Sequence, residues 1–102
     1  EADRESVRRD VSACMDSLRA AVRYTLERAK DDEAAGRIEE AKQALNGVLH
    51  LGEYLREPDR LAIVQGVGKG IMRSSLRDLL AFYERKGDGE KAEEIRTRLA
   101  RL

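Results

Sequence analysis

Residues 7–29, VRRDVSACMDSLRAAVRYTLERA, decide the fold of this chain. Apolar side chains recur in this stretch at steps of three and four residues, which is the spacing of one face of an α-helix. The stripe comprises Val7, Val11, Cys14, Leu18, Val22, Leu26 and Ala29. It predicts a long helix over residues 3–34, ended by Gly36, because glycine readily adopts the left-handed conformation that terminates helices.

Three more helices are predicted downstream, at about residues 37–56, 58–86 and 89–102. Pro58 suits the first position of a helix, and Asp88 is a good N-cap. No segment shows the sustained alternation of a β-strand, and we discount the short run 61–64 because it has no second strand to pair with. The chain is therefore predicted to be all-α, a single domain over residues 1–102 folded as an antiparallel bundle of about four helices. Its predicted core contains Leu18, Val22, Leu26, Leu45, Leu49, Leu76 and Leu80.

Two stretches of the sequence are alike. Residues 35–41 and 86–92 each place an alanine, Ala41 or Ala92, five residues after a glycine. This pattern resembles the turn and second helix of a tetratricopeptide hairpin. The copies lie 51 residues apart, from Gly36 to Gly87, whereas that repeat has a period of about 34. We interpret the likeness as chemistry shared by helical hairpins in general.

Gly66, Gly68 and Gly70 occupy every second position inside the third predicted helix. Each costs a helix roughly 1 kcal/mol relative to alanine, so a compensating role is expected. The favoured role is close packing: Gly66 and Gly70 share a face and would approach Gly52, with Ala41 and Ala44 nearby, while Gly68 points elsewhere. The alternative is a break over 66–70 that serves as a hinge or a ligand contact.

Residues 58–86 hold six Lys or Arg against three Asp or Glu, the one clearly basic stretch. Lys69, Arg73 and Arg77 follow each other at four-residue steps and form a basic stripe on one helix face. If a helix restarts near Ile71, its free amides would add an anion site. The spacing of the glycines does not match a phosphate-binding loop or a dinucleotide fingerprint. We favour a solvated face, because no exposed aromatic side chains accompany the stripe to stack on bases.

Composition excludes several classes of function. The 20 Lys and Arg residues balance 20 Asp and Glu, so no net charge draws the chain to nucleic acid or to an anionic membrane. No apolar run approaches the length of a membrane span. Cys14 and His50 are the only residues of their kinds, and they form no recognisable catalytic or metal-binding set. We expect no catalysis, no cofactor and no metal.

A lone cysteine favours a reducing, cytoplasmic compartment. Because the chain begins with Glu1 rather than methionine, we expect either a trimmed chain or a domain excised from a longer protein. Cys14 is predicted to lie in the core, and His50 to border the apolar stripe and bond a carbonyl or carboxylate. The acidic run 31–33 is predicted to be a solvated helix end that frays, since negative charge there opposes the helix dipole.

Helix lengths point to a partner. The second helix would reach back along the first only as far as Met15, which leaves Val7 and Val11 on an uncovered overhang. We predict a non-catalytic protein-interaction or oligomerisation module with regulation as one use, most simply a homodimer through Val7 and Val11. The alternative occupant of the overhang is a missing part of the parent protein. The alternative function is a small regulator that binds nucleic acid or a phosphorylated ligand through Lys69, Arg73 and Arg77.

Overall fold

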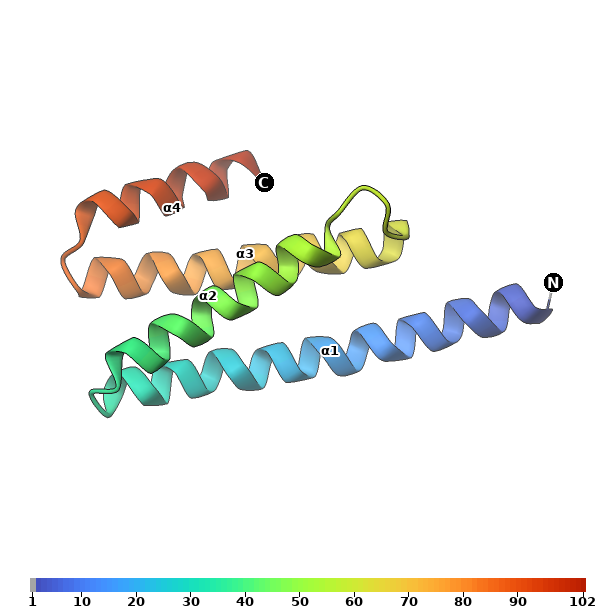
Figure 1. Ribbon diagram of the computed structural model, residues 1–102, viewed down its shortest axis with the longest axis horizontal. Helices are drawn as coiled ribbons and strands as arrows, with labels where there is room; N and C mark the ends of the chain where they lie inside the picture. The colour runs from blue at the N-terminus through green and yellow to red at the C-terminus, as the bar shows by residue number, and fades with distance from the viewer. Residues whose placement is uncertain (1) are drawn as a thin grey trace.

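The computed structural model describes residues 2–102 and contains four α-helices: α1 (Ala2–Ala34), α2 (Ile38–Leu55), α3 (Ala62–Arg85) and α4 (Gly89–Arg101). Successive helices run in opposite directions, and the N-terminal end of α1 projects beyond the other helices (Figure 1). The predicted all-α class, the four helices and the long first helix are confirmed.

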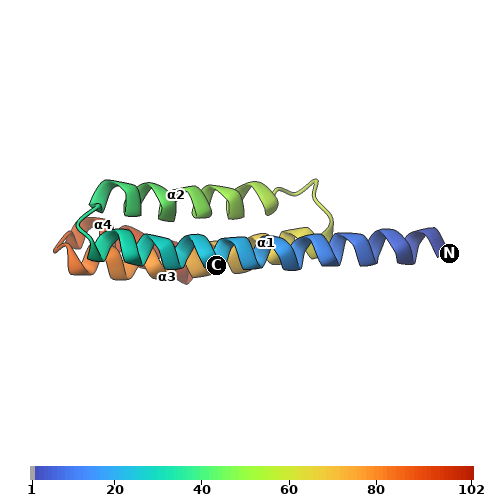
Figure 2. The same cartoon turned by 90° about the horizontal axis from the view of Figure 1, so that it is seen from below.

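The helices form a flat assembly whose Cα extents are 54 × 29 × 14 Å. α1, α3 and α4 lie side by side, and α2 lies across one face of the pair α1 and α3 (Figures 1 and 2). Contacts join each helix to its neighbours in sequence, and α1 also touches α3 directly. The face of α1 and α3 opposite α2 carries no helix of residues 2–102 (Figure 2).

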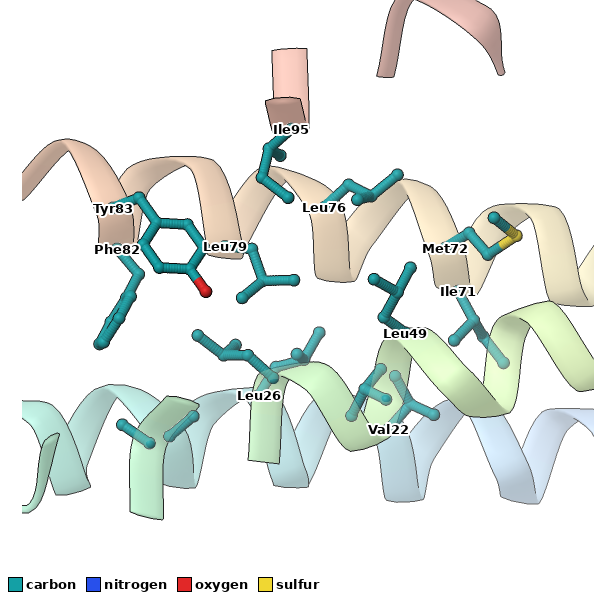
Figure 3. Close-up of a cluster of buried hydrophobic side chains, with 14 of the residues drawn as sticks. Val22, Leu26, Leu49, Ile71, Met72, Leu76, Leu79, Phe82, Tyr83 and Ile95 are labelled. Atoms are coloured by element: carbon teal, nitrogen blue, oxygen red, sulfur yellow. The ribbon is translucent and has the colours of Figure 1, made fainter. Parts of the chain in front are cut away.

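The core fills the space between α1, α2 and α3 and continues beneath α4 (Figure 3). Leu76 and Leu79 of α3 are fully buried at its centre. Leu18 and Leu80 are only partly buried, because they lie at the edges of the helix contacts rather than between them. The other predicted core residues are confirmed as buried: Val22, Leu26, Leu45, Leu49 and Leu76.

The buried side of α1 differs from the predicted stripe at Cys14. The Cys14 side chain is exposed, and its neighbour Met15 is buried in the core instead. The reason is that α1 packs against both α2 and α3, so its buried side is centred on Met15, Val22, Leu26 and Ala29. The placement of Cys14 in the core was therefore wrong.

The turns after α1 and after α3 are built alike. Gly36 and Gly87 adopt φ values of 86° and 72°, the left-handed conformation that favours glycine. In each turn the glycine amide donates to a carbonyl three residues back, and the next amide to one five residues back. The alanines five residues after each glycine, Ala41 and Ala92, are both buried. The likeness of the two stretches in sequence is thus a likeness of two helical hairpins.

α3 begins at Ala62 and not at Pro58 as predicted. Residues 57–60 form a turn closed by the Arg60 amide, which donates to the carbonyl of Glu57 at 3.0 Å. The Gln65 side-chain nitrogen lies 3.0–3.1 Å from the carbonyl oxygens of Glu57, Pro58 and Arg60. The prediction failed because these residues are needed to carry the chain from α2 to the start of α3.

Candidate functional site

Gly68, not the pair Gly66 and Gly70, makes the close contact between α3 and α2. A Cβ atom on Gly68 would lie 2.8 Å from the carbonyl oxygen of Gly52 and 2.9 Å from the amide nitrogen of Arg56. A Cβ atom on Gly52 would in turn lie 2.9 Å from the carbonyl oxygen of Gly68. The predicted contact between glycines of α2 and α3 therefore exists, and Gly52 was correctly identified. The α3 partner was predicted wrongly, because Gly68 lies against α2 and the pair Gly66 and Gly70 does not.

Gly66 and Gly70 lie in open space, since a Cβ atom at either position would meet nothing within 4 Å. α3 is also continuous from Ala62 to Arg85, so the predicted break at 66–70 is absent. The amides of these residues are engaged in the helix, and the predicted anion site at a helix start near Ile71 does not form. The two glycines face a groove instead.

The central groove, as we call it, runs between α1 and α3 and has a volume of about 350 Å³. Gly66, Gly70 and Ser74 form its α3 wall, and Arg19 and Arg23 line its α1 side. Val22 and Val67 supply an apolar floor, and no residue of α2 or α4 reaches it. The arrangement offers an apolar trough beside two arginines.

The basic stripe lies where the sequence places it, on α3. Arg73 and Arg77 are exposed and Lys69 is half-buried, and none forms an ion pair with any residue in the range 2–102. None of the three lines the central groove, whereas Arg19 lines it from α1 and pairs with Asp16 at 2.7 Å. The sequence did not reveal the contribution of α1, because it depends on how α1 and α3 lie together.

The N-terminal groove, a second hollow of about 600 Å³, lies where the α1 overhang meets the start of α3. Val7 and Val11 line it from α1, and Leu61 and Ile63 line it from the other side. Val7, Leu61 and Ile63 are 58%, 60% and 42% exposed. Val11 packs partly against the core, so the predicted uncovered position is correct for Val7 and wrong for Val11. Leu61 and Ile63 were missed as site residues, although their apolar run was visible in the sequence.

The opposite end of α1 is fixed to α3 by charge. Arg85 donates two hydrogen bonds to the Glu33 carboxylate, at 2.6 and 3.0 Å, and Lys86 Nζ lies 3.5 Å from it. Asp32 pairs with Arg37 at 2.9 Å. The predicted fraying of residues 31–33 was therefore wrong, because cations from the turn and from α3 neutralise the acidic helix end.

These contacts shift the ionisation of nearby carboxyls. The hydrogen bond from Arg85 holds the pKa of Glu33 below its ordinary value of 4.5. Partial burial raises the pKa of Asp78 above 3.8, against the attraction of Lys30 and Arg85. Glu33 and Asp78 therefore have opposite effects on stability at neutral pH. A carboxyl whose pKa is lowered by folding stabilises the fold, and one whose pKa is raised destabilises it.

We expect Glu33→Gln to remove a pH-dependent part of the stability. A carboxyl with a lowered pKa in the folded state stabilises the fold above its unfolded pKa, and this contribution is lost as pH falls through the folded pKa. At pH 7 the free energy of unfolding of the wild type should exceed that of the variant by less than about 1 kcal/mol, because Arg85 is half exposed and solvent weakens the ion pair. Urea unfolding from pH 7 down to below 4.5 should show that difference shrinking.

Asp10→Asn, at an exposed position beyond the first turn of α1 that forms no ion pair within residues 2–102, is the control for this measurement. It should change stability equally little at every pH. A difference between wild type and Glu33→Gln that stays constant down to acidic pH would contradict the role of the Glu33–Arg85 pair.

The remaining candidates for chemistry stand apart from both grooves. His50 is exposed, and within residues 2–102 it makes no hydrogen bond to a carbonyl or carboxylate, so that part of the prediction was wrong. No cluster of His, Cys, Asp and Glu in the described part of the chain could hold a metal ion.

No helix of residues 2–102 combines the length and apolar character needed to cross a membrane. No family model, curated protein or solved structure matches the chain.

Proposed function

We propose that this chain is a non-catalytic protein-interaction module that self-associates through the N-terminal groove. The observation that carries the proposal is the convergence of three exposed apolar side chains, Val7, Leu61 and Ile63, from separate segments at one place. Exposed apolar patches of this kind mark interaction sites more often than isolated side chains do. This is also where the α1 overhang leaves the body of the molecule (Figure 1).

A second copy of the chain is the favoured occupant. Between residues 3 and 10 the overhang carries three acidic and three basic side chains, so it can oppose its own copy without net repulsion. A two-fold contact also covers both apolar patches at once. The acidic members are Asp3, Glu5 and Asp10, and the basic members are Arg4, Arg8 and Arg9.

Val7→Asp is expected to shift the chain towards the monomer of 11.5 kDa by weakening self-association at least about tenfold. The substitution places a charge in the centre of the patch, where the partner would strip it of water. Because Val7 is exposed in the single chain, the stability of the monomer should change by less than about 0.5 kcal/mol. Light scattering and sedimentation over a range of concentrations would measure the shift.

Ser6→Asp is the matched control, since it adds the same charge one residue away at an exposed position outside the groove. It should leave assembly unchanged. A wild type that remains at 11.5 kDa at every concentration would contradict self-association, as would a Val7→Asp variant that assembles like the wild type.

A further inference from the structure

Gly66 and Gly70 have no role inside the folded chain that would offset their cost. Both are exposed, a Cβ atom added at either would meet nothing within 4 Å, and each makes α3 roughly 1 kcal/mol less stable than alanine would. Both line the central groove. With Ala62 and Ser74 they form a row of four exposed small residues at four-residue steps, which leaves the α3 backbone accessible from that side.

The opposite wall and the floor give this groove a chemical character. Arg19 and Arg23 line it from α1, and the floor contains the buried side chains of Val22, Val67 and Ile71. Gly66 and Gly70 lie on the side of α3 away from Gly68, which contacts α2. Figure 2 shows no helix of residues 2–102 on the face of α1 and α3 opposite α2. The groove thus has an apolar base, a wall of small residues on the α3 side and two arginines on the α1 side.

The lining of the groove contains two arginines and no acidic residue, although the whole chain is neutral. Arg73 and Arg77 continue the exposed surface of α3 beside Ser74, and neither pairs with an acidic residue in the described part of the chain. On the α1 side Arg23 is likewise unpaired within residues 2–102, and only Arg19 has an acidic partner, Asp16. Local charge of one sign in a neutral protein selects partners of the opposite sign.

We propose that the central groove binds an acidic amphipathic helix of a partner protein. Small residues spaced by four allow a second helix to approach α3 closely. The apolar floor would receive the apolar stripe of that helix, and the four arginines would pair with acidic side chains flanking the stripe. A protein is favoured over nucleic acid because the exposed tyrosines, Tyr24 and Tyr54, do not line the groove and supply no stacking surface there.

The test uses a synthetic helical peptide with a leucine stripe flanked by glutamates, titrated into the full chain and followed by anisotropy and by NMR. We expect the amide signals of Gly66, Gly70 and Ser74 to shift. Arg23→Glu and Gly70→Leu should each weaken binding at least about tenfold, the first by charge repulsion and the second by filling the groove. The same peptide with lysines in place of glutamates should bind at least about tenfold more weakly to the wild type.

Two control variants keep the result interpretable. Gly47→Leu makes the same exchange at an exposed α2 glycine with open space around it, outside the central groove. Arg28→Glu reverses an exposed α1 charge that does not line the groove. Both should bind the acidic peptide like the wild type, and circular dichroism should show that all four variants remain helical.

Failure would be equally clear. The proposal is overturned if the acidic peptide does not bind, if Gly70→Leu binds it as tightly as Gly47→Leu does, or if a single-stranded oligonucleotide binds the groove in place of the peptide. The outcome does not depend on self-association, because the titration can be repeated in the Val7→Asp variant. Binding that survives in that variant separates the central groove from the N-terminal one.

Discussion

Gly68→Ala should destabilise the chain by about 2 kcal/mol, although alanine is the better helix former. The added methyl would lie within 3.0 Å of three backbone atoms, two in α2 (Gly52 and Leu55) and one in its C-cap residue Arg56. Backbone cannot move aside as a flexible side chain can, so we take the upper end of the usual cost of overpacking, about 3 kcal/mol. The gain in helix propensity returns only about 1 kcal/mol. Thermal unfolding should show a fall in Tm of about 8–16 °C.

Gly70→Ala is the matched control, two residues away in the same helix. It gains the same propensity with no clash, so we expect stabilisation by about 0.5–1 kcal/mol. The two substitutions therefore change stability in opposite directions. Equal effects of the same sign would show that α2 and α3 do not cross at Gly52 and Gly68.

Leu76→Ala should cost about 3–5 kcal/mol, the largest effect of any single substitution proposed for this protein. The Leu76 side chain is fully buried, at 0% exposure, in the core of α3 (Figure 3). Removing it forfeits the transfer free energy of the deleted carbons and leaves a cavity that the surrounding helices cannot fully close. Urea unfolding would show a lower midpoint with an unchanged slope.

Leu80→Ala makes the same exchange one turn later, at a partly buried position. It should cost roughly half as much, because fewer contacts are lost and water can enter the space. An equal loss at the two positions would contradict the orientation of α3. Loss of all cooperative unfolding in Leu76→Ala would mean that the chain has less stability in reserve than a typical small domain.

The helical architecture could be predicted because it depends on local periodicity. The stripe from Val7 to Ala29 identified α1 to within a residue or two, and Gly36 and Gly87 marked two of the three connections. The connection between α2 and α3 was predicted wrongly, because Pro58 suits a helix start and a turn equally well. Sequence does not say how many residues are needed to bridge two helices whose separation is unknown.

The sites were harder to predict because they depend on how the helices rotate against each other. Periodicity puts Gly66 and Gly70 on one face and Gly68 on another, but only the packed structure shows which face meets α2. Cys14 and Met15 are adjacent, so a small rotation of α1 exchanges their environments. The convergence of Val7 with Leu61 and Ile63 joins residues more than 50 positions apart, and no local pattern encodes it.

The order of contacts has a consequence for the folding pathway. Each helix packs chiefly on its neighbours in sequence, and α1 with α3 is the one contact between non-consecutive helices of residues 2–102. Chains dominated by such near contacts close only short loops and fold in microseconds to milliseconds. α4 packs mainly on α3 and reaches α2 through side chains such as the Arg98–Glu53 ion pair at 2.8 Å, so we expect it to detach and reattach more readily than the other three helices.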